Sequence, residues 1–403
     1  MSDQLLVAGE AERPSGDGEP VGTRPATAAG PTARALRALL AVLPQWATAR
    51  VVVIAALALG HLVVDRVHPA NGTAAAHVHQ GLLGWDAGWY KAIATFGYVP
   101  LGRQSVRFFP LFPLLGHAVA VLPGVGDGAA LVAIANASAL VATAMLVALV
   151  RRETGDRALA VRAAWLFSLA PPAFTLVMGY AEGLLAIGTI GCFLALRRAG
   201  GTPSWWWAAA AAFGAALTRP LGALLVLPIA VAALRRWPAA GTGERLRAAV
   251  AVAAPVAGVG AFLCWSWVTF GDAWLPVQVQ TQSGHHGGLS DPFATLVHDA
   301  AGAHHHVGTA LHVPWAVLVV VLLVVCWLRW PSEYGVFATG VVVVALTGTN
   351  LDSFERYALS AFPVVLAAAG LLSRPQVERV VLTLAAAGLL GYALLAFLGL
   401  SVP

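Results

Sequence analysis

The sequence predicts an all-α polytopic membrane protein, a bundle of about nine to twelve transmembrane helices with long loops on one side. Of the 403 residues, 59% are apolar and only 11% are charged, whereas about a quarter of an ordinary soluble domain is charged. The apolar residues gather in runs near the length of about 20 residues that a helix needs to cross a bilayer. The basic residues fall between these runs and form no single patch, so nucleic acid is not an expected partner.

The N-terminal segment differs from the rest of the chain. Residues 1 to about 45 are rich in Pro, Gly, Ala and Thr and contain no apolar run. This composition is typical of a disordered tail, and it lacks the short apolar region and cleavage site of a signal peptide. We therefore expect a disordered cytoplasmic tail over 1–45 and one multi-pass domain over 46–403, beginning with an uncleaved span at about Arg50 to Val64.

Ten further apolar runs follow the first. Several are shorter than about 18 residues, so some are expected to be re-entrant or fused. Two long connections, at about 65–127 and 271–312, interrupt them, and loops of that length in a compact bundle are usually functional or disordered. The runs lie at about 128–150, 159–178, 181–196, 204–217, 220–234, 248–270, 313–330, 335–349, 357–372 and 380–400.

The distribution of basic residues predicts the orientation, because short loops rich in Arg and Lys stay in the cytoplasm. Alternate connections carry 13 arginines and are placed in the cytoplasm: Arg151, Arg152, Arg157, Arg162, Arg197, Arg198, Arg235, Arg236, Arg245, Arg247, Arg329, Arg374 and Arg379. The opposite connections carry six basic residues against nine acids: Arg66, Lys91, Arg103, Arg107, Arg219 and Arg356. We expect a plasma-membrane protein with a cytoplasmic N-terminus and both long loops outside.

The first long loop contains a candidate amphipathic helix, WDAGWYKAIATFGY, over residues 85–98. On a helix, its apolar residues recur at spacings of three and four: Trp85, Trp89, Ala92, Ile93 and Phe96. Such a helix is too short to span and is expected to lie along the membrane surface. Asp86 falls beside this face in the first turn, where a carboxylate also gains from the helix dipole. The alternative interpretation of Asp86 is an ordinary first-turn acid.

Four charged residues fall near the outer ends of apolar runs, where a charge is costly unless it is paired or functional. They are Asp86, Glu182, Arg219 and Arg356. Arg219 lies between two short runs with arginines at their inner ends, so we expect it at the apex of an outward-facing hairpin. An arginine that merely reaches into the headgroups is the alternative for this position.

Several motifs together resemble a known family. The stretch at 85–98 is followed by RFFPLFPLL at 107–115, then by SLAPPAF at 168–174 and GYAEGLL at 179–185. TRPLG at 218–222 and Arg356-Tyr357 with Phe362-Pro363 come later in the same order. This pattern resembles the second mannosyltransferase of glycosylphosphatidylinositol-anchor synthesis, the PIG-V family, and its bacterial relatives. The resemblance implies a membrane glycosyltransferase of the C-type fold (GT-C).

The resemblance implies an inverting hexosyltransferase, with mannose as the suggested sugar, that uses a polyprenyl-phosphate sugar donor and a lipid or glycan acceptor on the outer face. Asp86 is then the candidate general base, which takes the proton of the attacking hydroxyl. The planar guanidinium of arginine suits a phosphate diester, and the candidates are Arg219, Arg356 and Arg107. Glu182 either binds a hydroxyl or neutralises an arginine. Trp85 and Tyr90 complete the candidate substrate-binding residues.

Other functions remain open at this stage. A transporter or flippase for lipid-linked sugars also places charges at membrane depth, although we find no clear internal repeat. A non-catalytic partner of a transferase would keep the fold and tolerate loss of Asp86. No metal or other cofactor is expected, because adventitious binding is the simpler reading of the histidines in the second long loop: His285, His286, His298, His304, His305, His306 and His312. Cys192, Cys264 and Cys326 lie in apolar runs and are interpreted as packing residues.

Overall fold

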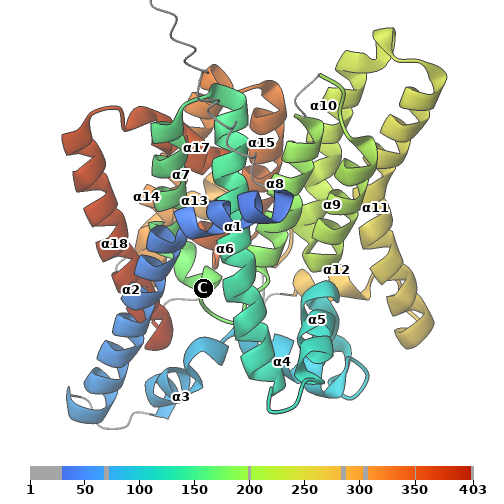
Figure 1. Cartoon of the computed structure of the whole chain (residues 1–403). Coiled ribbons are helices and arrows are strands. Elements are labelled where there is room, and N and C mark those ends of the chain that lie inside the picture. The colour runs from blue at the N-terminus through green and yellow to red at the C-terminus, as the bar shows by residue number, and fades with distance from the viewer. Residues whose placement is uncertain are drawn as a thin grey trace, which may run out of the picture.

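The computed structural model describes residues 30–67, 72–197, 201–282, 287–302, 307–349 and 351–400. Within these ranges the chain folds into a helical bundle without a β-strand (Figure 1). The only extended pairing among them is an isolated antiparallel bridge between Leu289 and Gly348. The predicted all-α class is therefore confirmed for the described chain.

Six of the described helices are long and apolar enough to cross a membrane. The pair α16 (Phe354–Ser360) and α17 (Phe362–Leu371) makes a seventh span if it is counted as one segment bent by 80°. Two of the six spanning segments are longer than the α-helix that they contain, because Leu43–Arg66 also includes a π turn and Pro220–Ala239 also includes 3₁₀ turns. The six helices are α2 (Leu43–Leu62), α6 (Asp127–Thr154), α10 (Val226–Arg236), α11 (Thr242–Phe270), α14 (Val307–Arg329) and α18 (Pro375–Phe397).

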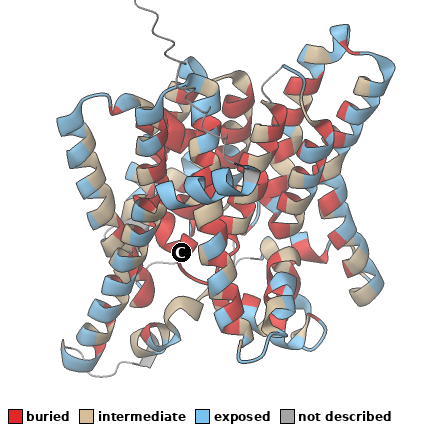
Figure 2. Cartoon of the chain, viewed as in Figure 1, coloured by how far each residue is buried: buried red, intermediate tan, exposed pale blue. Residues whose placement is uncertain are grey.

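The outer surface of the bundle is apolar. Large aliphatic side chains are exposed along the flanking helices, among them Val51, Val268, Val317 and Leu384. Figure 2 shows exposed residues running down the outer faces of α2, α11 and α18, with buried residues concentrated between the helices. Soluble monomers rarely expose apolar patches of this extent. This is a multi-pass membrane protein.

Six or seven described segments of spanning length are fewer than the nine to twelve spans predicted, and proline accounts for much of the difference. The run at 159–178 is divided into α7 (Arg157–Leu169) and a 3₁₀ segment (Pro171–Leu176), because proline removes a helical hydrogen bond and disfavours helical backbone in the residue before it. In the same way, α9 (Trp205–Thr218) stops just before Pro220. The runs at 181–196 and 335–349 form the short helices α8 (Glu182–Leu196) and α15 (Ser332–Leu346).

The two long connections are largely helical. The first holds α3 (Gly72–Gln80), α4 (Asp86–Phe96) and α5 (Leu111–Ala120), and the second holds α12 (Leu275–Gln280) and α13 (Pro292–Gly302). Residues 68–71, 283–286 and 303–306 of these loops lie outside the described ranges.

Helix α4 lies within the predicted amphipathic segment, and it packs on the protein through a flank beside the apolar face that was expected to lie along the membrane surface. Ala87, Tyr90, Ile93 and Ala94 are buried, whereas Phe96 is 63% exposed. The helix rests on a cluster of aromatic side chains, and that support turns the Tyr90 side inward. Periodicity alone identifies an apolar face but not which flank of it the neighbouring elements cover.

Part of the segment predicted as a disordered N-terminal tail is helical. Residues 1–29 lie outside the described ranges, but α1 (Pro31–Ala41) and the first residues of α2 are helical within the segment expected to be disordered. Proline stands at the start of both helices, a position where its missing amide hydrogen is not needed. In Figure 1, α1 crosses in front of α6.

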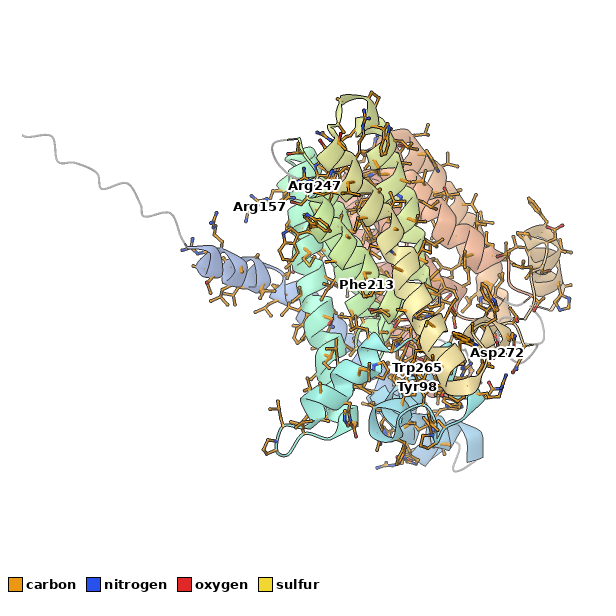
Figure 3. All side chains as sticks on the ribbon, turned by 90° about the vertical axis from the view of Figure 1, so that its right-hand side faces the viewer. Tyr98, Arg157, Phe213, Arg247, Trp265 and Asp272 are labelled. Atoms are coloured by element: carbon orange, nitrogen blue, oxygen red, sulfur yellow. The ribbon has the colours of Figure 1, made fainter. Side chains whose placement is uncertain are left out.

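Among the described residues, the arginines predicted for the cytoplasmic connections gather at one end of the bundle, and Arg103, paired with Asp272, lies at the other. At one end, Arg197 pairs with Glu153 at 2.9 Å, and other arginines pair with Glu244 and Glu333. We call this the arginine-rich end, and the end that carries α3, α4, α5 and α12 the loop end. Figure 3 shows Arg157 and Arg247 at the former, and Tyr98, Trp265 and Asp272 at the latter.

Candidate functional site

Four charged side chains from four distant parts of the chain meet inside the bundle. Arg356 Nη1 lies 2.7 Å from Asp86 Oδ2, and Arg356 Nε lies 3.4 Å from Glu182 Oε1. Glu182 Oε1 also forms an ion pair with Arg219 Nη1. We call these four residues the charge cluster. It contains two arginines and two carboxylates, so its formal charges cancel.

The charge cluster is almost wholly removed from solvent. The side chain of Glu182 is 2% exposed, that of Arg356 5% and that of Arg219 10%. Asp86 is the most accessible member, with 26% of its side chain exposed. Burying four charges costs free energy that only their mutual pairing can offset. Asp86 is therefore the member of the cluster that is most accessible from outside the protein.

Breaks between helices position these side chains. Asp86 is the first residue of α4 and Glu182 the first of α8, so both carboxylates lie at the positive end of a helix dipole. Arg219 caps the C-terminal, negative end of α9, directly before Pro220. Arg356 lies in the short helix α16. The same proline and turn residues that shorten the predicted spans thus bring the charges to helix ends.

Two residues beside the cluster have an unusual backbone conformation. Trp85 (φ 57°) and Ser353 (φ 68°) are the positive-φ residues other than glycine in the described chain. Such strain is costly and tends to concentrate at functional sites. Ser353 Oγ accepts a hydrogen bond from Arg356 Nη2 at 3.2 Å, and the peptide unit of Trp85 leads directly into Asp86. Both strained residues therefore orient a member of the charge cluster.

The candidate Trp85 does not line the cluster with its side chain. Its indole Nε1 donates a hydrogen bond to the carbonyl of Ala396 at 2.9 Å, and its ring stacks on His77 with centroids 4.3 Å apart. The hydrogen bond attaches the start of α4 to α18, and the stacking attaches it to α3. Trp85 thus positions Asp86 and makes no polar contact with the arginines in the described structure.

Two tyrosines at the cluster were not among the residues selected from the sequence. The guanidinium carbon of Arg356 lies 5.3 Å from the ring centroid of Tyr180 and 5.5 Å from that of Tyr357. Arg219 lies 5.3 Å from the Tyr357 ring, and the backbone N–H of Asp86 donates to Tyr180 Oη at 3.3 Å. The sequence feature that could have identified these two tyrosines is their position, because they lie next to Glu182 and Arg356 in the motifs.

Arg107 and Tyr90 lie at the edge of the cluster. The Arg107 guanidinium lies 4.6 Å from the Phe108 ring centroid and 5.5 Å from that of Trp89. Tyr90 packs edge-on against Phe108 and Phe112. Burial raises the pKa of Tyr90, and the negative charges of Glu182 and Asp86 add to that effect. Tyr90 is therefore a neutral hydroxyl at physiological pH and can donate a hydrogen bond.

The ionisation of Asp86 follows from its surroundings. Burial acts to raise its pKa, but the charge and hydrogen bond of Arg356, helped by Arg107 and Arg219, act in the opposite direction and prevail. The pKa of Asp86 is therefore lower than that of an ordinary aspartate, and the side chain is ionised at neutral pH. A carboxylate held in this state is a weak base for as long as Arg356 remains paired with it.

A second group of ionisable side chains includes Glu355 of α16, the residue before Arg356 in the sequence. His312 Nδ1 lies 3.0 Å from Glu355 Oε1, and His312 Nε2 lies 4.0 Å from Asp352 Oδ1. Of the other histidines in the predicted His-rich loop, His298 is exposed, and 285–286 and 304–306 lie outside the described ranges. No metal-binding group of three or more His, Cys, Asp or Glu is found among the described residues.

The lowered pKa of Asp86 predicts how stability depends on pH. The pKa of Asp86 in the folded protein lies below its value of about 3.9 in the unfolded chain. Ionised Asp86 therefore contributes its full stabilisation at pH values above about 3.9. This contribution is lost as the pH falls through the pKa of the folded state. We expect the difference in Tm between the wild type and Asp86→Asn to stay constant from about pH 8 to 5 and to shrink below about pH 4. A difference that shrank between about pH 8 and 5 would indicate a raised pKa.

Comparisons with known proteins add no assignment to this geometry. No protein-family model matches the chain, and no curated protein matches it in sequence. The chemistry available to the charge cluster follows from its own residues and from the fold that buries them.

Proposed function

We propose that this protein is an integral membrane glycosyltransferase of the C-type fold. It moves a hexose, with mannose as the first candidate, from a polyprenyl-phosphate sugar to a lipid or glycan acceptor. The observation that carries the proposal is the pair between Asp86 and Arg356, a partly accessible carboxylate held 2.7 Å from a buried guanidinium. Charges inside an apolar bundle are rare and usually functional.

The proposed reaction is a single displacement that inverts the anomeric carbon. The hydroxyl oxygen of the acceptor attacks that carbon while Asp86 accepts the hydroxyl proton. The bond between the anomeric carbon and the phosphate oxygen breaks, and its electron pair leaves with polyprenyl phosphate. Arg356 and Arg219 offset the charge that develops on the phosphate, which is the form of stabilisation that contributes most in such sites.

The closed charge cluster suggests how the donor activates the base. The phosphate of the donor competes with Asp86 for Arg356, because the guanidinium binds phosphate and carboxylate in the same planar geometry. When Arg356 turns to the phosphate, Asp86 loses the partner that lowers its pKa. The carboxylate then becomes a stronger base at the moment when the donor is in place.

The size of the inner cavity supports an approach of substrates from the opposite side of the cluster. A cavity of about 10 Å³, lined by Glu182, Thr189, Ser360 and Phe362, lies behind the cluster. That volume is about what one water molecule needs and cannot hold a sugar. We therefore infer that substrates reach the cluster from the exposed side of Asp86, and that Arg107 and Tyr90 at the edge of the cluster are further candidate contacts. We assign phosphate or hydroxyl contacts at that edge to these two residues.

The direct test is transfer of radiolabelled mannose from polyprenyl-phosphate mannose in membranes that contain the protein. We expect a labelled lipid or glycan product with the wild type, and a rate at least about tenfold lower with Arg219→Lys, since lysine keeps the charge but loses the bidentate geometry. A transporter would instead move labelled donor across the membrane without forming product. If the protein is a non-catalytic partner of a transferase, the purified chain assayed alone would form no labelled product.

The orientation is also part of the proposal, with the loop end outside and the arginine-rich end in the cytoplasm. Cysteines at exposed positions of the two ends, Leu122→Cys and Thr242→Cys, can be labelled on intact cells with a membrane-impermeant maleimide in a Cys264→Ser background. Cys192 and Cys326 are buried. We expect Leu122→Cys to react and Thr242→Cys to react only after the membrane is opened. The reverse pattern would place the charge cluster on the cytoplasmic side.

A further inference from the structure

The outer face of α9 and α11 carries an apolar groove near the arginine-rich end. Its two walls each repeat at helical spacing: Trp206, Ala209, Ala210 and Phe213 on α9, and Val250, Ala253, Ala254 and Ala257 on α11. The groove has a volume of about 460 Å³. At its lower end the helices touch, because a Cβ atom on Gly258 would lie 2.8 Å from the carbonyl oxygen of Phe213. Figure 3 shows this face with Phe213 labelled.

A polar pocket of about 410 Å³ continues the groove at the arginine-rich end and shares Trp206 with it. It is lined by the segment from Thr202 to Trp207 and by Glu244 and Arg247. Arg236 neutralises Glu244, since its Nε lies 2.9 Å from Glu244 Oε1, and Trp205 Nε1 donates a hydrogen bond to the same oxygen at 3.4 Å. The exposed side chain of Arg247 therefore leaves this pocket with an excess of positive charge.

The backbone adds to that positive potential. Both α9 and α11 begin at this pocket, with Trp205 and Thr242 as their first residues. The first amide groups of a helix have no partner within the helix, and the helix dipole places partial positive charge there. Neither start carries a side-chain cap. Two helix starts, one arginine and an adjoining apolar groove thus form one continuous surface.

We propose that this surface binds an anionic phospholipid, with the phosphate at Arg247 and an acyl chain in the groove between α9 and α11. The positively charged pocket is followed by the apolar groove, which matches the charged headgroup and the apolar acyl chain of a phospholipid. The pocket is also remote from the charge cluster, because the 14 residues of α9 that separate Trp205 from Arg219 span about 21 Å at 1.5 Å per residue. The site is thus distinct from the proposed transfer site.

The test is lipid retention by the purified full-length protein, measured by native mass spectrometry with added phosphatidylglycerol or phosphatidylcholine. We expect the wild type to retain phosphatidylglycerol in preference to phosphatidylcholine. Arg247→Gln should bind phosphatidylglycerol about tenfold or more weakly, as expected for loss of a charged hydrogen bond. Arg157→Gln, an exposed arginine at the same end that lines neither pocket, should bind as the wild type does.

A second pair of variants tests the tail. Ala253→Phe fills the groove and should lower retention of both lipids, while Ala249→Phe, also exposed on α11 but outside the groove, should not. Equal losses in Arg247→Gln and Arg157→Gln, or unchanged retention in Ala253→Phe, would overturn the proposal. Displacement of phosphatidylglycerol by polyprenyl phosphate would also overturn it and identify a donor path instead. Lipid retention requires no transfer activity, so the two proposals can fail independently.

Discussion

Replacement of Asp86 by Asn is expected to lower the transfer rate by about 10²–10⁴-fold, the usual range for loss of a general base. Asparagine keeps the shape and one acceptor oxygen but cannot take the proton of the acceptor hydroxyl. The measurement is the initial rate of transfer from polyprenyl-phosphate mannose, with donor binding followed separately. Donor binding should persist, since Arg356 and Arg219 remain.

The same substitution should also destabilise the protein. An isolated first-turn acid contributes about 0.3–1 kcal/mol, but Asp86 neutralises a buried arginine, so we expect a loss of about 1–3 kcal/mol. Asp127→Asn is the matched control, because Asp127 is also a first-turn acid at the loop end but lies outside the charge cluster. Asp127→Asn should transfer at the normal rate. Near-normal transfer by Asp86→Asn would remove Asp86 as the base.

Glu182→Gln should give the largest loss of stability of any single change at the site. It leaves Arg219 and Arg356 buried with one carboxylate between them, and breaking a buried ion pair costs about 3–5 kcal/mol. We expect a Tm far below that of the wild type, or failure to accumulate in membranes.

The double variant Glu182→Gln with Arg219→Gln keeps the test informative if the single variant does not fold. Removing one charge of each sign restores the balance of the cluster, so the double variant should recover part of the lost stability, and a double-mutant cycle measures the coupling. Glu333→Gln is the control, since its partner Arg235 is 55% exposed and can be solvated by water when unpaired. A Glu333→Gln loss as large as that of Glu182→Gln would contradict the idea that burial of the arginines sets the cost.

The sequence alone identified most individual residues of the site, but not which of them contact one another. Charges that interrupt apolar runs are conspicuous because the bilayer penalises them, and so Asp86, Glu182, Arg219 and Arg356 were all selected. Tyr180 and Tyr357 carry no such signal, because an aromatic residue beside an apolar run is ordinary. Trp85 was selected for its motif, yet its hydrogen bond to Ala396 shows that it positions the helix.

Composition and hydropathy were sufficient to determine the helical membrane class, because the need to satisfy every backbone hydrogen bond in lipid allows few structures. They overestimated how many helices of spanning length the described residues form, since a run broken by proline has the same hydropathy as an unbroken one. Only the tertiary structure decided which charges pair. Asp86 and Arg356 are 270 positions apart, and their contact depends on the directions in which α4 and α16 leave their strained turns. Local sequence patterns do not predict this long-range contact, because the packing between helices determines it.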